Sequence, residues 1–286
     1  MPDESSIASA HLLQIVKYMD VVSITILVFD YLVSLDLEIS LVWGSRWSLS
    51  KIFYMLARYP PFIDVPLVLW YGLTPIAIKD CLPVYAAASW GTFFGIAMAE
   101  AILVLRTYAL MGCSSRVLLV FGIQYIAILC ITIAVLSLFL KSLKFGPPPI
   151  PTVVGCQIAD GSIILVVAFI LVLLNETIMM LCTLWVGVKR YRHSFNPLIH
   201  TLYRDGITYF ILLFLISSGN LAVLIWGPLE LVDLLNTFLR VMHSVLSTRC
   251  LLHIREVHRD EARTGITTQE EPKFRIPGTS MEYTIN

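Results

Sequence analysis

Residues Val117–Leu140 read VLLVFGIQYIAILCITIAVLSLFL, an unbroken run that contains no charged side chain. A helix that crosses the hydrocarbon core of a bilayer needs about 20 consecutive, mostly apolar residues, and this run is long enough. In the whole chain 57% of the residues are hydrophobic and 14% are charged, whereas a soluble domain has about 45–50% and about 25%. Polar residues are too few to cover so apolar a core in water. The sequence therefore predicts an all-α integral membrane protein.

Further stretches of the chain have the same length and composition, and together they predict a bundle of seven transmembrane helices over residues 15–254. The seven are Ile15–Leu35, Ile52–Leu73, Val84–Leu110, Val117–Leu140, Ile163–Val188, Ile207–Trp226 and Leu231–Leu252. The second contains Arg58, Asp64 and several prolines, so we expect that span to be kinked or broken. Residues 1–14 are predicted to be an extracellular tail, and residues 255–286 a partly disordered cytoplasmic tail.

Lysine and arginine decide the orientation, because loops on the cytoplasmic side carry an excess of them. With the N-terminus outside, fourteen of the 20 lie on the inner side and four on the outer side, while Arg58 and Arg240 lie within spans. The sequence therefore predicts an outer N-terminus and a cytoplasmic C-terminus, in the plasma membrane or an endomembrane. An even number of helices would destroy this asymmetry, so it also favours seven. The net charge of zero argues against nucleic-acid binding.

Several short strings stand at intervals along the chain. They are Asp30-Tyr31, Glu38, Trp43 and Arg58-Tyr59; AEAILVLRTYAL from Ala99 to Leu110; Gly155-Cys156; Glu176-Thr177; Tyr203-Arg204-Asp205-Gly206; and Ser247-Thr248-Arg249 with Leu251–Glu256. Together they resemble an uncharacterised family of seven-transmembrane proteins from mushroom-forming fungi, a family of unknown function with a receptor-like topology. Met111 and His253 depart from that family's pattern, which usually has Tyr and Asn there. The resemblance implies the architecture and no established activity.

Six of the charged side chains inside the predicted spans are candidates for buried functional groups, because an ionisable group in lipid is costly and usually faces the bundle interior. They are Asp30, Arg58, Asp64, Glu100, Glu176 and Arg240. Asp30 and Arg58 both stand near the cytoplasmic end, and we expect them to form an ion pair that joins the first two spans. Glu176 and Arg240 stand nearer mid-depth and are a second candidate pair.

Two functional surfaces are predicted from these charges. The polar groups of a ligand cavity are predicted to be Asp64, Glu100, Glu176 and Arg240. For Glu100 and Glu176 a purely structural role is an equal alternative. Arg106 ends the third span, and Arg204 and Asp205 open the sixth, so these three are predicted to form a cytoplasmic face. An ion pair between Arg106 and Asp205 is geometrically possible there.

Cysteine and histidine give two further expectations. Cys81 and Cys156 are both on the outer side in the predicted topology, where oxidising conditions favour a disulfide between them; two free loop thiols are the alternative. The histidines form no HExxH or comparable pattern, so we expect no metal site. No cofactor is expected either.

Sequence motifs of catalysis are absent, including the Walker loop, the nucleophile elbow and the dinucleotide fingerprint, so an enzyme is not expected. A retinal protein needs a Schiff-base lysine in its last helix, and Leu231–Leu252 contains none. The leading hypothesis is a receptor-like protein that binds a small or lipidic ligand and a cytoplasmic signalling partner. The alternatives are a proton-coupled transporter, which the broken second span and the buried carboxylates favour, and a non-catalytic membrane scaffold.

Overall fold

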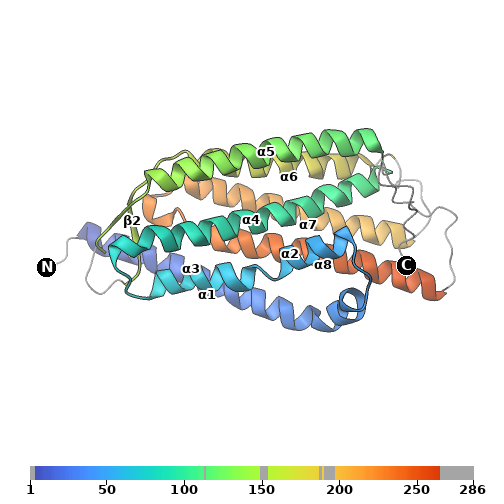
Figure 1. Cartoon of the computed structure of the whole chain (residues 1–286), viewed down its shortest axis with the longest axis horizontal. Coiled ribbons are helices and arrows are strands. Elements are labelled where there is room, and N and C mark those ends of the chain that lie inside the picture. Colours follow the sequence, from blue (N-terminus) through green and yellow to red (C-terminus); the bar gives the residue numbers. More distant parts are fainter. Residues whose placement is uncertain (1–3, 113, 149–153, 187–188, 190–196, 265–286) are drawn as a thin grey trace.

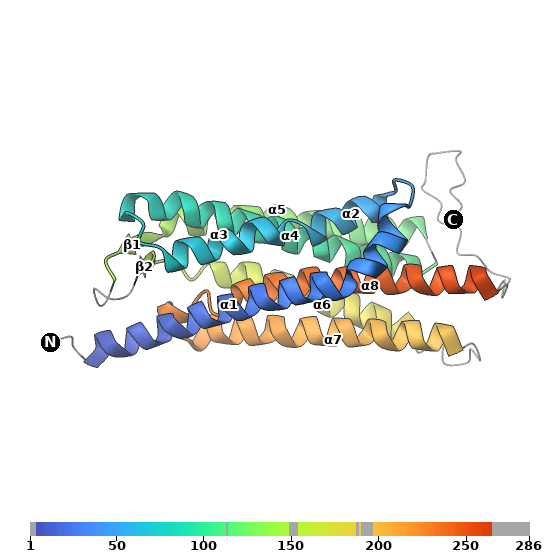
Figure 2. The same cartoon turned by 90° about the horizontal axis from the view of Figure 1, so that it is seen from below.

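Long helices run side by side from one end of the molecule to the other (Figure 1 and Figure 2). This computed structural model describes residues 4–112, 114–148, 154–186, 189 and 197–264, with the backbone alone for 197–206, 258 and 260–264. The beginning of the first helix and a small β-hairpin lie at one end of the bundle, and the last helix finishes at the other. We call these the hairpin end and the α8 end.

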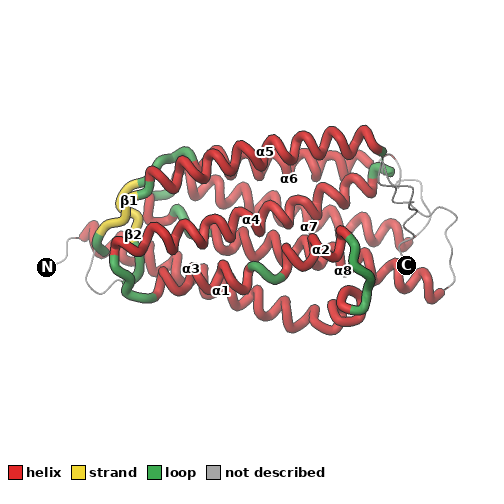
Figure 3. Tube along the Cα trace, viewed as in Figure 1, coloured by secondary structure: helices red, strands yellow, loops and turns green. Residues whose placement is uncertain are grey.

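Eight α-helices make up the bundle within the described residues. They are α1 (Glu4–Glu38), α2 (Leu49–Arg58), α3 (Pro61–Leu73), α4 (Ile78–Leu110), α5 (Ser115–Ser142), α6 (Leu165–Val186), α7 (Pro197–Trp226) and α8 (Asn236–Thr264). A π-helical turn, Ile39–Trp43, continues α1, and a 3₁₀ turn, Leu229–Leu231, joins α7 to α8. Figure 3 shows how little of the described chain is not helical.

Six segments of the described chain are long and apolar enough to cross a membrane. They are Glu4–Trp43, Leu49–Leu73, Ile78–Leu110, Ser115–Ser142, Leu165–Val186 and Ile207–Trp226. On α5 the side chains of Leu119, Ile123 and Ile126 are each at least 60% exposed. Such a face is unfavourable in water but is matched to lipid tails. The chain is therefore a multi-pass membrane protein, as the composition predicts.

Helix α8 is the predicted seventh span that does not meet the same apolar criterion. It packs against α1, α2, α3, α4 and α7, so other helices rather than lipid surround much of it. Its wholly buried polar side chains are Arg240, His243, Ser244, Ser247 and Thr248. The helix also begins at Asn236 and not at Leu231, because Leu229–Leu231 forms the 3₁₀ turn.

The second predicted span is broken, as its prolines suggest. The Ser48 side chain caps the start of α2 by accepting a hydrogen bond from the Lys51 backbone N–H at 3.3 Å. Pro60 and Pro61 have no N–H to continue the helical ladder, so α2 ends at Arg58 and α3 starts anew at Pro61. The break leaves Arg58 in the last turn of a helix, with its side chain wholly buried.

The N-terminal segment differs from the expected tail. Helix α1 already begins at Glu4, so most of residues 1–14 extend the first span. One contact joins this extension to the turn before α8: the Ser9 hydroxyl donates to Glu230 Oε1 at 2.7 Å. Just beyond the extension, Lys17 Nζ donates to the Val154 carbonyl at 2.5 Å.

A short hairpin and a disulfide close the hairpin end, an addition to the expected all-α fold. Strands β1 (Lys144–Gly146) and β2 (Gln157–Asp160) pair antiparallel. Cys156 is bonded to Cys81 at the start of α4, and the Cys156 N–H donates to the Tyr71 carbonyl at 3.2 Å. Gly155 has φ +101°, and a Cβ there would lie 2.3 Å from the Gly72 carbonyl oxygen. Only glycine lets the loop backbone approach α3 so closely.

Candidate functional site

Charged side chains line α8 at three levels, and each level contacts different helices. From the hairpin end they are Arg240, His243 and Arg249. The buried residues between them, such as Ser244 and Ser247, follow the spacing of three or four residues that places side chains on one face of a helix. The candidate site is this polar face of α8 together with its partners.

Arg240 forms a buried ion pair with Asp64 of α3. Its Nε and Nη2 lie 3.1 and 3.0 Å from Asp64 Oδ2, and both side chains are almost completely buried. Gly95 of α4 makes room for the guanidinium, since a Cβ at Gly95 would lie 1.9 Å from Arg240 Cζ. Gly91, one turn earlier, admits Asp64 in the same way, with a Cβ that would come within 2.8 Å of the Asp64 Cβ. The pair therefore occupies a groove of two glycines.

This pairing corrects the predicted partnership of Arg240 with Glu176. The two residues are both at mid-depth, but depth along the membrane does not say which way a side chain points. The guanidinium turns toward α3 and α4 because the glycine groove is there. Glu176 instead contacts His243 and Ser217.

His243 lies between two buried carboxylates from different helices. Its Nδ1 is 3.5 Å from Glu100 Oε1 of α4, and its Nε2 is 3.0 Å from Glu176 Oε1 of α6. Asn175 Nδ2 donates to Glu100 Oε2, and the Ser217 hydroxyl donates to Glu176 Oε1 at 2.7 Å. We call Glu100, His243 and Glu176 the His243 triad. Ligand atoms from its three members all lie within 4.8 Å of one another, so these residues could hold a metal ion.

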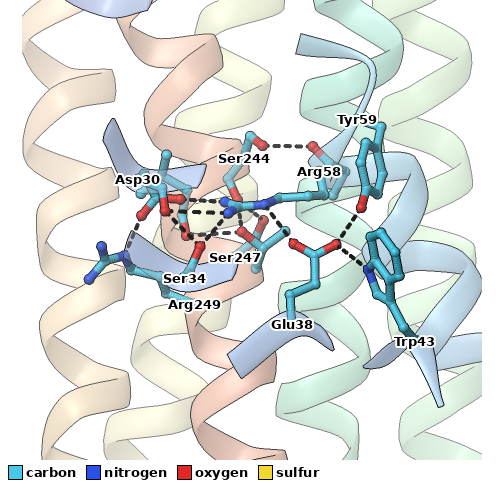
Figure 4. A network of polar contacts seen from close by, with 12 residues as sticks. Asp30, Ser34, Glu38, Trp43, Arg58, Tyr59, Ser244, Ser247 and Arg249 are labelled. Carbon is cyan, nitrogen blue, oxygen red and sulfur yellow. Dashed lines mark hydrogen bonds and ion pairs between the residues drawn. The ribbon is translucent and has the colours of Figure 1, made fainter. Parts of the chain in front are cut away.

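A different arrangement surrounds Arg58, nearer the α8 end (Figure 4). Arg58 Nη1 donates to Asp30 Oδ2, Nη2 donates to the Ser34 hydroxyl, and Nε lies 3.5 Å from Glu38 Oε2. Arg249 of α8 donates to the other oxygen of Asp30. We call Asp30, Glu38, Arg58 and Arg249, with Ser34, the Arg58 network. Asp30 and Arg58 do join the first two predicted spans, and α8 is joined as a third partner.

Neutral donors complete the Arg58 network. The Glu38 carboxylate is wholly buried, and its Oε1 accepts hydrogen bonds from the Tyr59 hydroxyl and from Trp43 Nε1, the latter at 3.1 Å. The Ser244 hydroxyl donates to the Ala57 carbonyl at 2.7 Å, which ties α8 to the end of α2. Each carboxylate of the network thus faces cations and donors from more than one helix.

A polar contact of another kind lies at the hairpin end, in the turn that precedes α8. Tyr85 donates its hydroxyl hydrogen to Asp233 Oδ1 at 3.1 Å. Burial raises the pKa of the Asp233 carboxyl to about 6, although hydrogen bonds from Tyr85 and Asn236 favour the charged form and lower it. The Tyr85 ring also packs edge-on against Tyr71 and Phe145, so this contact joins the hairpin to the helices beneath it.

The four residues predicted to line one ligand cavity do not gather in one. A crevice of about 40 Å³ lies between α4, α5 and α6, and Glu100 and Asn175 are its acidic and amide groups. Asp64, Glu176 and Arg240 are not in its lining. Each of these three has a close polar or charged partner among the described residues.

The predicted cytoplasmic face is described only in part. Arg106 is buried, with its guanidinium carbon 5.8 Å from the centre of the Phe210 ring. The side chains of Arg204 and Asp205 lie outside the described residues, so an ion pair between Arg106 and Asp205 stays a prediction. Their backbone belongs to α7, which begins ten residues earlier than the predicted span, at Pro197.

Sequence reasoning missed three members of these clusters, Glu38, His243 and Arg249. Glu38 and Arg249 belong to the strings that resemble the family. Glu38 lies just beyond a predicted span and Arg249 near the end of one, where water can solvate a charge and no partner is expected. His243 is three residues after Arg240, on the same face of a helix that had to be buried. That spacing is the signal that could have identified it.

Comparison with known proteins bears on one part of the site. Residues 18–63 match the model of a family described as a family of unknown function, DUF6533. No curated protein matches the chain. The matched segment runs from α1 to the start of α3 and includes most of the Arg58 network, namely Asp30, Ser34, Glu38 and Arg58. The part of the chain that is similar to this family thus supplies one of the buried charged contacts with α8.

Proposed function

We propose that the chain is a seven-helix, receptor-like membrane protein in which α8 is the seventh span. At about 1.5 Å per residue, the residues of Asn236–Thr264 are more than enough for a hydrocarbon core of about 30 Å. The buried polar residues of α8 face other helices, so they need no contact with lipid. A helix enclosed in this way can cross the membrane without an apolar surface all round.

The proposed orientation has the N-terminus and the hairpin end outside. The Cys81–Cys156 disulfide lies at the hairpin end, and disulfides persist in oxidising, extracytoplasmic surroundings. Arg249, Arg255 and Arg259 lie toward the α8 end, as positive charges do on the cytoplasmic side. Single cysteines at Ser6 and Ser114 test this orientation: a membrane-impermeant reagent applied to intact cells should label Ser6→Cys alone. Labelling of Ser114→Cys from outside would contradict it.

One observation carries the receptor-like role: a single helix, α8, has charged contacts with other helices at three positions along its length. Arg240 pairs with Asp64, His243 lies between Glu100 and Glu176, and Arg249 reaches the Arg58 network. A ligand that moved α8 at one level would change the contacts at the others, which is what signal transmission through a helix bundle requires. The crevice beside Glu100 opens between helices, which favours a lipidic ligand that arrives from within the bilayer.

Hydrogen exchange can test this coupling without knowing the ligand. Asp64→Asn weakens the contact with Arg240 at one level of α8. We expect faster exchange not only in α3 but also in Leu49–Arg58, because α8 transmits the change to the Arg58 network. The control is Asp160→Asn, which removes an exposed charge paired with Lys144 and should change neither region. Effects of Asp64→Asn confined to α3 and α4 would contradict the proposed role.

A proton-coupled transporter is the second candidate, and one observation favours it. The break between α2 and α3 lies directly beside Arg58, and transporters place their ion sites at interrupted helices. Titratable groups then follow one another along α8. Proteoliposomes with an internal pH dye decide between the two roles: proton uptake by the wild type that is lost in Glu176→Gln supports transport. A wild type that moves no protons, but shows the exchange coupling above, supports the receptor-like role.

A further inference from the structure

The charges of the His243 triad do not balance. Two carboxylates face one imidazole, so the triad is negative whether the ring is neutral or protonated, unless a carboxylate takes up a proton. All three side chains are almost completely buried. An uncompensated charge in a low-dielectric interior is strongly unfavourable, and within the described residues no arginine or lysine is recorded in an ion pair with Glu100 or Glu176. The triad is therefore complete only when it takes up a proton or a further positive ion.

The polar atoms of the triad are divided into two sets. Glu100 Oε2 and Glu176 Oε1 are each held by a neutral donor, Asn175 and Ser217 respectively. Glu100 Oε1 and Glu176 Oε2 make no hydrogen bond within the described part of the chain, although both are buried, and the two ring nitrogens of His243 face Glu100 Oε1 at 3.5 Å and Glu176 Oε1 at 3.0 Å. One oxygen of each carboxylate is thus oriented while the other is left available. Metal-binding carboxylates are oriented by hydrogen bonds to their other oxygen in the same way.

We propose that Glu100, Glu176 and His243 bind a divalent first-row transition-metal ion. One imidazole nitrogen and two carboxylate oxygens are ligands that Zn²⁺ accepts at about 2.0–2.2 Å, which puts neighbouring ligand atoms somewhat more than 3 Å apart. One ligand atom from each residue lies within 4.8 Å of the other two. Because the contacts at 3.5 and 3.0 Å use different ring nitrogens of His243, a side chain must shift before one nitrogen and both carboxylates can share an ion. The double positive charge neutralises both carboxylates beside a neutral imidazole.

The ligand types and the surroundings of the triad narrow the choice of metal ion further. Imidazole favours zinc and its neighbours over Mg²⁺ and Ca²⁺, which prefer oxygen ligands alone. The crevice between α4, α5 and α6 reaches Glu100 and Asn175 on one side of the site. This inference is independent of the proposed receptor-like role, because it concerns what the triad binds and not what the bundle does with it.

Metal binding to the purified, tag-free protein in detergent tests the proposal. The protein is treated with a chelator, transferred to metal-free buffer and titrated with Zn²⁺ alone, and bound zinc is measured by mass spectrometry and calorimetry. We expect one zinc per chain and a rise in the thermal unfolding midpoint, with no rise from Mg²⁺ or Ca²⁺. Co²⁺ in its place should give a visible absorption band. A wild type that binds no zinc under these conditions overturns the proposal. It is overturned as well if the stability of the protein responds to pH but not to zinc.

Variants locate the bound ion. His243→Asn and Glu100→Gln should abolish binding, whereas Ser217→Ala, which removes only an orienting donor, should weaken it about 10- to 100-fold. His11→Asn is the matched control, because His11 is an exposed histidine on α1 and its loss should leave zinc binding unchanged. If His243→Asn does not fold, Glu176→Asp and Ser217→Ala still test the site. Zinc binding that is equal in every folded variant of the triad overturns the assignment.

Discussion

The Arg58 network and the His243 triad are both buried ionic clusters that join α8 to other helices, but they differ in their balance of charge. In the Arg58 network two arginines, Arg58 and Arg249, face the carboxylates of Asp30 and Glu38. The triad has two carboxylates and one histidine. A balanced cluster can hold helices together by itself, whereas an unbalanced one is complete only with a further ion or proton. The difference separates a structural element from a binding site.

The largest effect is expected from removing the centre of the balanced cluster. Arg58→Met leaves two buried carboxylates opposite one partly exposed arginine. Breaking a buried ion pair on one side costs about 3–5 kcal/mol, so we expect a sharp fall in the thermal unfolding midpoint in detergent, or failure to express. The triple variant Arg58→Met, Asp30→Asn, Glu38→Gln removes all three charges together and should recover much of the loss. Equal destabilisation of the single and triple variants would mean that packing, not charge, dominates this cluster.

When one carboxylate of each cluster is neutralised, we expect the stability of the protein to fall in one case and to be unchanged or to rise in the other. Asp30→Asn weakens charged hydrogen bonds from Arg58 and Arg249, and we expect a loss of about 1.5–3 kcal/mol. Glu176→Gln removes surplus negative charge, while its amide oxygen still accepts the Ser217 hydroxyl. In chelator-treated protein its unfolding midpoint should therefore be equal to that of the wild type or higher. A similar fall in both variants would show that the triad is balanced by a partner from the chain itself.

The ion pair between Asp64 and Arg240 is balanced in charge like the Arg58 network, and its glycine groove can be filled directly. Gly95→Ala puts a methyl group where the Arg240 guanidinium lies, so the Arg240 side chain must move. Overpacking of this kind costs about 1–3 kcal/mol. The matched control is Gly122→Ala on α5, where nothing lies within 4 Å of a new Cβ and a helical glycine is replaced by a better helix former. Equal midpoints for the two variants would contradict the groove.

Much of the fold follows from the sequence because lipid imposes a simple rule on each span. Length and apolar content located most of the helices, and Pro60 and Pro61 located the break in the second span. The same rule fails for α8, whose polar residues are covered by protein and not by lipid. It also fails for residues 4–14, which continue helix α1 and contact the turn before α8 through Ser9 and Glu230.

The candidate site was less predictable than the fold, because partners are chosen by direction and space. Asp30 and Arg58 could be paired from their common depth alone. Arg240 could not, since its partner depends on two glycines of α4 that admit the guanidinium. Prediction of the triad would have required knowing that α4, α6 and α8 meet at one point. Nothing in the spacing of Glu100, Glu176 and His243 along the chain contains that information.

The smallest effect concerns the neutral donors that complete the balanced cluster. Tyr59→Phe and Trp43→Phe each remove one donor from Glu38 Oε1, and each should cost about 0.5–1.5 kcal/mol because the other donor remains. The double variant leaves that buried oxygen with neither of them, so its loss in unfolding free energy should exceed the sum of the single losses. Tyr18→Phe, at an exposed tyrosine of α1, serves as the control and should be nearly neutral. Strict additivity of the two losses would mean that water reaches Glu38, in which case the Arg58 network is less closed than its burial indicates.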